Sequence, residues 1–316
     1  MLKRIDRQQI RAGMFVEDME GAWDSNPLQK RRLLLNSATA QQLRSSDLSG
    51  VVINTARGID AISAFMADRR VADAGLAEGP RLAASAAAET VQRSSALLSD
   101  LFTAAGAGGA ISFDAAAHIT AEISKSIDHN PSMFISVTRL KTKDEATFVH
   151  SVAVGALMIH FGRYLRLDEA TVQLLGVAGL LHDVGKLEVP EAILNKQGTL
   201  DEAEMRVMRD HPVLGHKILL RQDGMPEMVL DICLHHHERI DGRGYPEKLS
   251  GGGLSFFARL AAICDVYDAV TSVRPYKKPW TASEALSWML RRDGQFDHKL
   301  LKKFILCLTA TLPRRN

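Results

Sequence analysis

The pattern of apolar and polar positions divides the chain into a short first part and a long second part. Short apolar runs at 14–16, 33–35 and 51–53 are separated by polar and turn-forming residues, which is typical of β-strands. From Arg81 to Phe102, alanine and leucine recur without proline or glycine, which predicts a helix. We therefore expect a small β-rich domain over residues 1–75.

Residues 76–132 are predicted to form a helical linker. The glycine-rich stretch 105–110 interrupts the first helix, a second helical pattern covers 113–127, and Asn130, Pro131 and Ser132 end it. We expect these helices to act as a packing spacer or as the contact of a homodimer, and not as a ligand site.

Residues 133–316 are predicted to form a third, almost entirely helical part. Runs of helical length with apolar periodicity cover 150–165, 170–185, 202–220, 227–240, 257–270 and 282–292. Thr199 and Asp201 are candidate N-caps for the third run. The predicted fold class is mainly α, with a helical domain preceded by a small β-rich domain and a helical linker.

The composition is that of a globular protein, with 46% hydrophobic and 24% charged residues in a chain of 316. A net charge of +2 provides no field that would attract nucleic acid or an anionic membrane. The three cysteines are widely spaced in apolar runs, which indicates buried free thiols in a reducing compartment. Because no apolar run reaches 18 residues and the N-terminus lacks an apolar signal core, we expect a cytoplasmic protein without a membrane segment.

Histidines and aspartates interrupt the predicted helices. His182 and Asp183 follow the apolar run VQLLGVAGLL, where polar groups cost free energy unless they are paired or bind metal. Alone, this dyad fits a helix C-terminus capped by Gly185 at least as well. Further histidines and another aspartate accompany it, however, at His150, His211, His236, His237 and Asp265.

This combination of side chains favours a particular metal chemistry. Imidazole and carboxylate without thiolate suit iron, manganese or another first-row divalent ion better than structural zinc. Adjacent helical residues point ~100° apart, so each histidine of a pair can reach a different metal, and Asp183 can bridge two cations. Two metals roughly 3.5–4 Å apart would stabilise the attacking and leaving oxygens of phosphoryl transfer.

The motifs over 133–308 resemble, in order and spacing, the HD-GYP family of HD-superfamily phosphodiesterases, which hydrolyse cyclic di-GMP. The N-terminal stretches IRAGMFV and GVVINTARG resemble the uncharacterised small β domain that often precedes HD-GYP modules. The matching motifs are His150-Ser151, HDVGK at 182–186, VPEAIL at 189–194, His211-Pro212, HHERIDGRGYP at 236–246, DVYDA at 265–269 and RPYKK at 274–278.

The resemblance implies a role for each matching residue. It makes Asp183 catalytic and places Lys186 where it assists the phosphate or the leaving group. The seven metal ligands that it implies are His150, His182, Asp183, His211, His236, His237 and Asp265. Asp268 is expected to orient a ligand or a phosphate-binding side chain. The residues implied to bind substrate are Gly244 and Tyr245, which line the pocket, and Arg274 and Lys277, which hold the phosphates.

One position departs from part of the family. Relatives with a third metal have a glutamate four residues before the first ligand histidine, whereas this chain has Ala146. Glu145 is adjacent but points ~100° away if the helix is regular. We therefore predict two divalent ions per chain, with iron or manganese as the metal.

The predicted activity is metal-dependent hydrolysis of cyclic di-GMP to linear pGpG, which some relatives cleave further to GMP. Two alternatives remain. One is a catalytically silent cyclic di-GMP receptor that signals to a protein partner through its N-terminal half, and the other is a phosphodiesterase for another cyclic dinucleotide. Intact HD and GYP motifs favour the enzyme over the receptor.

Overall fold

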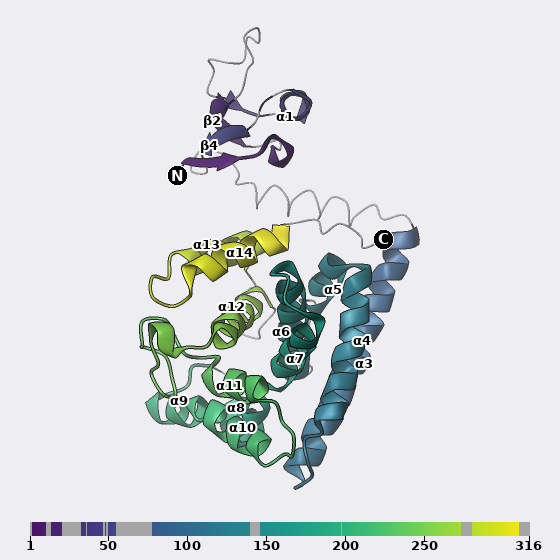
Figure 1. Ribbon diagram of the computed structural model, residues 1–316, viewed down its shortest axis with the longest axis vertical. Coiled ribbons are helices and arrows are strands. Elements are labelled where there is room, and N and C mark those ends of the chain that lie inside the picture. Colours follow the sequence, from purple (N-terminus) through teal and green to yellow (C-terminus); the bar gives the residue numbers. More distant parts are fainter. Residues whose placement is uncertain are drawn as a thin grey trace. The chain divides into compact units, whose positions relative to one another are not determined.

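The computed structural model describes residues 2–10, 14–20, 33–35, 37–46, 48, 50–54, 78–139, 146–196, 198–272 and 280–309. The chain divides into two compact units, Met1–Ala77 and Glu78–Asn316 (Figure 1). The mainly helical fold with a β-rich N-terminal part, which the sequence predicts, is confirmed.

The first unit contains a four-stranded antiparallel sheet with the strand order β1-β4-β2-β3. Its elements are β1 (Leu2–Ile5), β2 (Phe15–Glu20), β3 (Leu33–Leu34), α1 (Ser37–Arg44) and β4 (Gly50–Asn54). The apolar runs at 14–16, 33–35 and 51–53 coincide with β2, β3 and β4. The buried core of this unit includes Met14, Val16, Leu35, Val51 and Ile53 from these runs, together with Ile10 and Leu43. Strand β1 and helix α1 were not predicted from the pattern.

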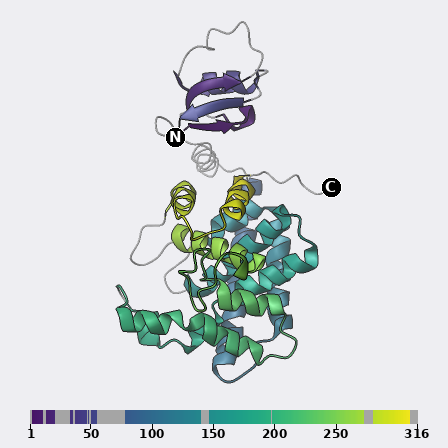
Figure 2. The ribbon, with the colours of Figure 1, turned by 60° about the vertical axis from the view of Figure 1, so that its left-hand side comes forward.

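The second unit is helical (Figures 1 and 2). Its helices are α3 (Glu78–Gly106), α4 (Phe113–His129), α5 (Pro131–Thr138), α6 (Ala146–Tyr164), α7 (Glu169–Leu181), α8 (Glu191–Leu194), α9 (Glu202–Arg209), α10 (His211–Leu220), α11 (Glu227–His235), α12 (Phe256–Thr271), α13 (Ala282–Leu290) and α14 (His298–Thr309). The long helices α3 and α4 lie side by side, and they pack against α6 and α7. The domain boundaries at 75 and 132 stay predictions.

Two predicted helical runs end or divide near the candidate ligands. The run 202–220 forms two helices, because Pro212 has no N–H and therefore suits the first turn of α10 better than a helix interior. Asp201, one of the two candidate caps, accepts hydrogen bonds from the first turn of α9. The run 170–185 ends at Leu181, and Val184–Glu188 form a 3-10 turn, η2.

Helices α6 and α7 cross closely at two glycines. A Cβ on Gly179 would lie 2.5 Å from the Cα of Gly155, so a larger residue would separate the helices. The other contacts join α12 to α6, α11 to α7 and α12, and α10 to α11 and η2. These contacts bring together the start of α6, the end of α7 and the end of α11.

Two expectations from composition can be compared with this structure. The thiols of Cys233, Cys264 and Cys307 are free and buried. In the part of the chain that is described, no helix combines the length and the apolar character needed to span a membrane.

Candidate metal centre

All seven predicted ligands lie close together, although five separate segments supply them. The ligand atoms within each of two groups lie within 4.8 Å of one another. We call them cluster A, formed by Asp183, His211, His236 and His237, and cluster B, formed by His150, His182 and Asp265.

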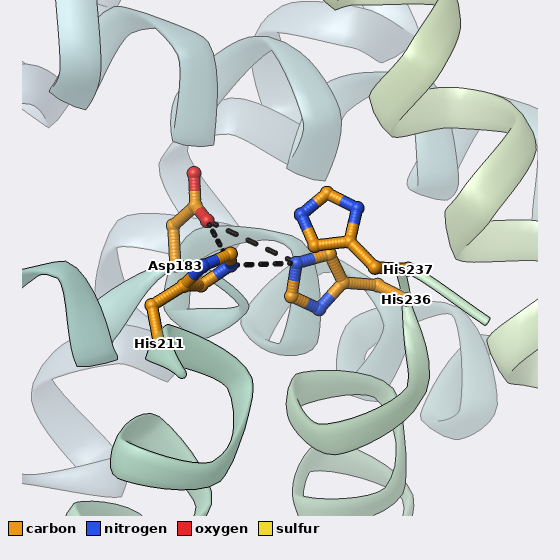
Figure 3. Close-up of side chains that lie close together, drawn as sticks. All are labelled: Asp183, His211, His236 and His237. Carbon is orange, nitrogen blue, oxygen red and sulfur yellow. Dashed lines mark hydrogen bonds and ion pairs between the residues drawn. The ribbon is translucent and has the colours of Figure 1, made fainter. Parts of the chain in front are cut away.

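Asp183 lies between the two clusters. Its Oδ1 is 3.2 Å from Nε2 of His211 and 3.9 Å from Nε2 of His236, as Figure 3 shows. Its Oδ2 is 3.3 Å from Nε2 of His182 and 3.7 Å from Nε2 of His150. The two oxygens of one carboxylate therefore face different clusters, which is the geometry that a bridging ligand requires.

Asp265, on α12, also contacts residues of both clusters. Its Oδ1 lies 3.1 Å from Nε2 of His150, and its Oδ2 lies 3.7 Å from Nδ1 of His237. The two clusters therefore form one continuous, largely buried polar centre.

In three of the histidines, hydrogen bonds at Nδ1 leave Nε2 facing the centre. Nδ1 of His182 donates to the carbonyl of Gly179 at 2.8 Å, and Nδ1 of His211 donates to the carbonyl of Met208 at 2.8 Å. Nδ1 of His236 lies 2.9 Å from the carbonyl of a residue in the last turn of α11. Because a carbonyl oxygen only accepts, these nitrogens carry the proton, and in the neutral ring Nε2 retains its lone pair.

His150 is oriented by a carboxylate. Its Nδ1 lies 2.6 Å from Oδ2 of Asp268, and Oδ1 of Asp268 accepts a hydrogen bond of 2.9 Å from Ser272. Asp268 was expected to orient a ligand, and this contact places it directly behind one.

The donor set fits divalent cations. Nε2 of His211 and Nε2 of His236 are 3.3 Å apart, so two lone pairs point at each other unless a proton or a cation lies between them. Nε2 of His182 is buried without a hydrogen-bond partner in the described part of the chain, which is costly for a polar atom. Neither cluster includes a cysteine, so the ligands are those of nitrogen- and oxygen-bound ions.

The electrostatics favour the protonation state that metal binding needs in Asp183, His236 and His237, whereas the pKa of His182 is raised, because the charge of Asp183 outweighs burial. Burial alone would raise the pKa of Asp183, but Lys186 and His182 hold that pKa well below its usual range. Burial lowers the pKa of His237 to about 3 and, with the neighbouring His237, holds the pKa of His236 well below its ordinary value. At neutral pH these rings are neutral and the carboxylate is ionised.

Lys186 lies at the edge of the centre. It belongs to η2 and forms an ion pair with Oδ2 of Asp183, while a quarter of its side chain is exposed (25%). Its ammonium group therefore places a positive charge between the two clusters and solvent.

The loop with the GYP motif folds back onto the ligands. A Cβ on Gly244 would overlap the backbone of Glu238, so this close approach requires glycine. The ring centroid of Tyr245 lies 4.8 Å from that of His237. Glu238 is buried, and its Oε1 accepts the backbone N–H of Glu247 at 2.7 Å, which closes the loop.

Other polar residues in and near this loop belong to neither cluster. Arg239 and Asp241 form an ion pair at 2.7 Å, whereas Glu238 accepts a hydrogen bond from the backbone of Glu247. His235 is not a ligand, because its Nδ1 bonds to Asp231 at 2.7 Å. The predicted phosphate-binding residues Arg274 and Lys277 lie outside the described residues.

Sequence reasoning missed Arg209. Its guanidinium carbon lies 5.6 Å from the centroid of the Tyr245 ring. A lone arginine at the end of an amphipathic helix carries no signal of its own, and only its place two residues before His211 could have drawn attention to it.

Comparisons with known proteins show the family of the chain. Residues 123–300 match the HD domain family, and residues 2–116 match a domain of unknown function, DUF3391. Cyclic di-GMP phosphodiesterase PA4108 of Pseudomonas aeruginosa is 42% identical over 315 residues, which cover 96% of this chain and 76% of that protein. The 3'3'-cGAMP-specific phosphodiesterase 2 of Vibrio cholerae is 31% identical over 182 residues, which cover 55% of this chain and 35% of that protein.

The fold also has a solved counterpart. Bd1817, an HDG"Y"P protein from Bdellovibrio bacteriovorus, matches with a TM-score of 0.60 and 16% identity, covering 98% of this chain and 100% of the other. At this identity the match shows the fold alone. The chain belongs to the HD domain family, and its predicted HD-GYP membership, with the small N-terminal domain that often precedes such modules, is confirmed.

Proposed function

We propose that this chain is a metal-dependent phosphodiesterase that hydrolyses cyclic di-GMP. The observation that carries the proposal is the carboxylate of Asp183, whose two oxygens face two separate ligand clusters. The relative named as a cyclic di-GMP phosphodiesterase aligns over nearly the whole of this chain, which supports the substrate.

Two divalent ions, iron or manganese, are the proposed cofactors. Cluster A and cluster B each offer a set of ligands for one ion, and the same cations would neutralise phosphate oxygens during in-line displacement. Helix α6 begins at Ala146, four residues before His150, so the chain has no carboxylate at the position that would complete a third site.

The residues of the chain then have distinct tasks. Asp183 and Asp265 hold both clusters together, and Asp268 orients His150. Lys186 is proposed to bind a phosphate oxygen or to protonate the leaving 3′ oxygen. Water supplies a hydroxyl to phosphorus and a proton to the 3′ oxygen, the P–O3′ bond breaks, and linear pGpG results. Gly244 and Tyr245 are proposed to line the pocket, and Arg274 and Lys277 to hold the phosphates.

A second substrate has a specific observation in its favour, because several relatives of 31–37% identity over about half of this chain are named 3'3'-cGAMP-specific phosphodiesterases. A silent receptor is disfavoured, because all seven ligands are present and brought together. We therefore keep cyclic di-GMP as the proposed substrate and cyclic GMP-AMP as the competitor.

The test uses the full chain loaded with iron or manganese. Incubation with cyclic di-GMP or with 3'3'-cyclic GMP-AMP, followed by chromatography of the products, gives kcat/KM for each. We expect pGpG from cyclic di-GMP at the higher kcat/KM, no product after chelation, and two metal ions per chain by elemental analysis. Binding of cyclic di-GMP without turnover by the metal-loaded chain would establish the receptor instead, and three ions per chain would refute the two-metal centre.

A further inference from the structure

An arginine that pairs with no carboxylate among the described residues lies at the edge of the metal centre. Arg209 is the last residue of α9, two positions before the ligand His211. Its guanidinium lies over the ring of Tyr245, and among the residues that the structure describes no acidic side chain pairs with it. Other arginines of this unit do pair, as Arg259 does with Asp297 at 2.9 Å.

The ring of Tyr245 connects this arginine to the ligands. Its centroid is 4.8 Å from that of His237, with 31° between the ring planes, and 5.6 Å from Cζ of Arg209. One aromatic side chain therefore separates the guanidinium from a ligand of cluster A. The other described cation beside the clusters, Lys186, is already paired with Asp183.

We propose that Arg209 binds the phosphodiester of the cyclic dinucleotide that is not being cleaved. This inference rests on the proposed function. A cyclic dinucleotide carries two phosphodiesters, and hydrolysis places only one of them at the metal clusters. The second negative charge therefore needs cations outside the clusters, where Arg209 acts together with the proposed phosphate-binding residues Arg274 and Lys277. A guanidinium presents two parallel N–H donors that match two non-bridging phosphate oxygens.

The position of its guanidinium over the Tyr245 ring makes Arg209 suitable for binding a phosphodiester. A cation held over an aromatic ring samples fewer side-chain conformers than a free one, so less entropy is lost when the phosphate binds. Its charge is also available, because the aromatic ring does not neutralise it as a carboxylate would. If Arg209 only stabilised the end of α9 and the position of Tyr245, its loss would lower stability without discriminating between substrates.

The experiment compares Arg209→Ala with Arg206→Ala in the metal-loaded full chain. Arg206 is an exposed arginine of the same helix, and none of the described contacts connects it to the centre. KM and kcat are measured with cyclic di-GMP and with bis(p-nitrophenyl) phosphate, which contains a single phosphodiester. Loss of one charge-assisted contact is expected to raise KM for cyclic di-GMP about tenfold in Arg209→Ala.

The increase in KM is expected to be much smaller for bis(p-nitrophenyl) phosphate, and smaller for cyclic di-GMP in Arg209→Lys, which keeps the charge but loses the planar fork. Arg206→Ala should behave as the wild type. The assignment is overturned if the wild type cleaves cyclic di-GMP and Arg209→Ala keeps its KM, or if KM rises equally for both substrates. A wild type that neither binds nor cleaves cyclic di-GMP refutes the proposed function, and the role of Arg209 with it.

Discussion

The contact between Asp268 and His150 makes the sharpest prediction about the metal centre. Oδ2 of Asp268 accepts a hydrogen bond from Nδ1 of His150 at 2.6 Å, and its Oδ1 accepts one from Ser272. In Asp268→Asn, the amide oxygen can keep the bond to His150 while the amide nitrogen donates to Ser272. The geometry is therefore retained, and only the negative charge behind the ring is lost.

This charge makes Nε2 of His150 a better metal ligand. Replacing such an outer partner of a ligand typically weakens metal affinity or activity about 10- to 100-fold, which corresponds to about 1.4 to 2.7 kcal/mol. We expect a loss in this range for Asp268→Asn and a larger one for Asp268→Ala, which also frees the ring. Metal affinity measured by competition with a chelator, with kcat on cyclic di-GMP as a second readout, tests the expectation.

The chain contains a matched control in α11. Asp231 likewise accepts hydrogen bonds from a histidine, His235 at 2.7 Å, and from a serine, Ser255. The other nitrogen of His235, however, lies 3.3 Å from Glu247 and not in a cluster. Asp231→Asn should therefore leave metal affinity unchanged. Equal affinities of wild type and Asp268→Asn, or equal losses in both variants, would refute the reasoning.

Three further predictions concern catalysis, packing and pH. Asp183→Ala should abolish hydrolysis and lower the metal content, because cluster A loses a ligand and cluster B loses the carboxylate oxygen that faces it, and full activity in a metal-replete variant would contradict the bridging role. In Gly185→Ala, the new Cβ would overlap backbone atoms of His211 and Gly215, so the free energy of unfolding should fall by about 3 kcal/mol. Urea denaturation measures this loss against Gly252→Ala, whose Cβ meets nothing within 4 Å, and equal stabilities would contradict it. Burial lowers the pKa of His160 from 6.5 to about 4, so the unfolded chain takes up a proton before the folded chain does. The neutral His160 ring therefore leaves the free energy of unfolding undiminished above pH 6.5, and this free energy falls by about 3 kcal/mol as the pH drops to 4. His160→Gln should reduce the acid sensitivity of the unfolding free energy by that amount, and an unchanged pH profile would refute it.

The sequence alone predicted the class of the fold from local patterns, and the set of ligands from the motifs that it shares with the HD-GYP family. Helical periodicity depends on which neighbours along the chain share a buried face, so α6, α7, α11 and α12 were visible as apolar repeats. Polar residues such as His182 and Asp265 stood out because they interrupt those faces. Element boundaries were less accurate, since Pro212 divides a run that looked continuous and β1 has few apolar residues.

Only the tertiary structure decided how those residues meet. Neighbours in sequence, His182 and Asp183, fall in different clusters, because the chain leaves α7 at that point and turns into η2. The tautomers of His182 and His150 depend on a carbonyl oxygen and on Asp268, respectively, which packing brings to Nδ1. Arg209 lies beside Tyr245 only because the fold brings α9 and the loop after α11 together. Contacts between segments far apart in sequence depend on packing geometry, which residue periodicity does not encode.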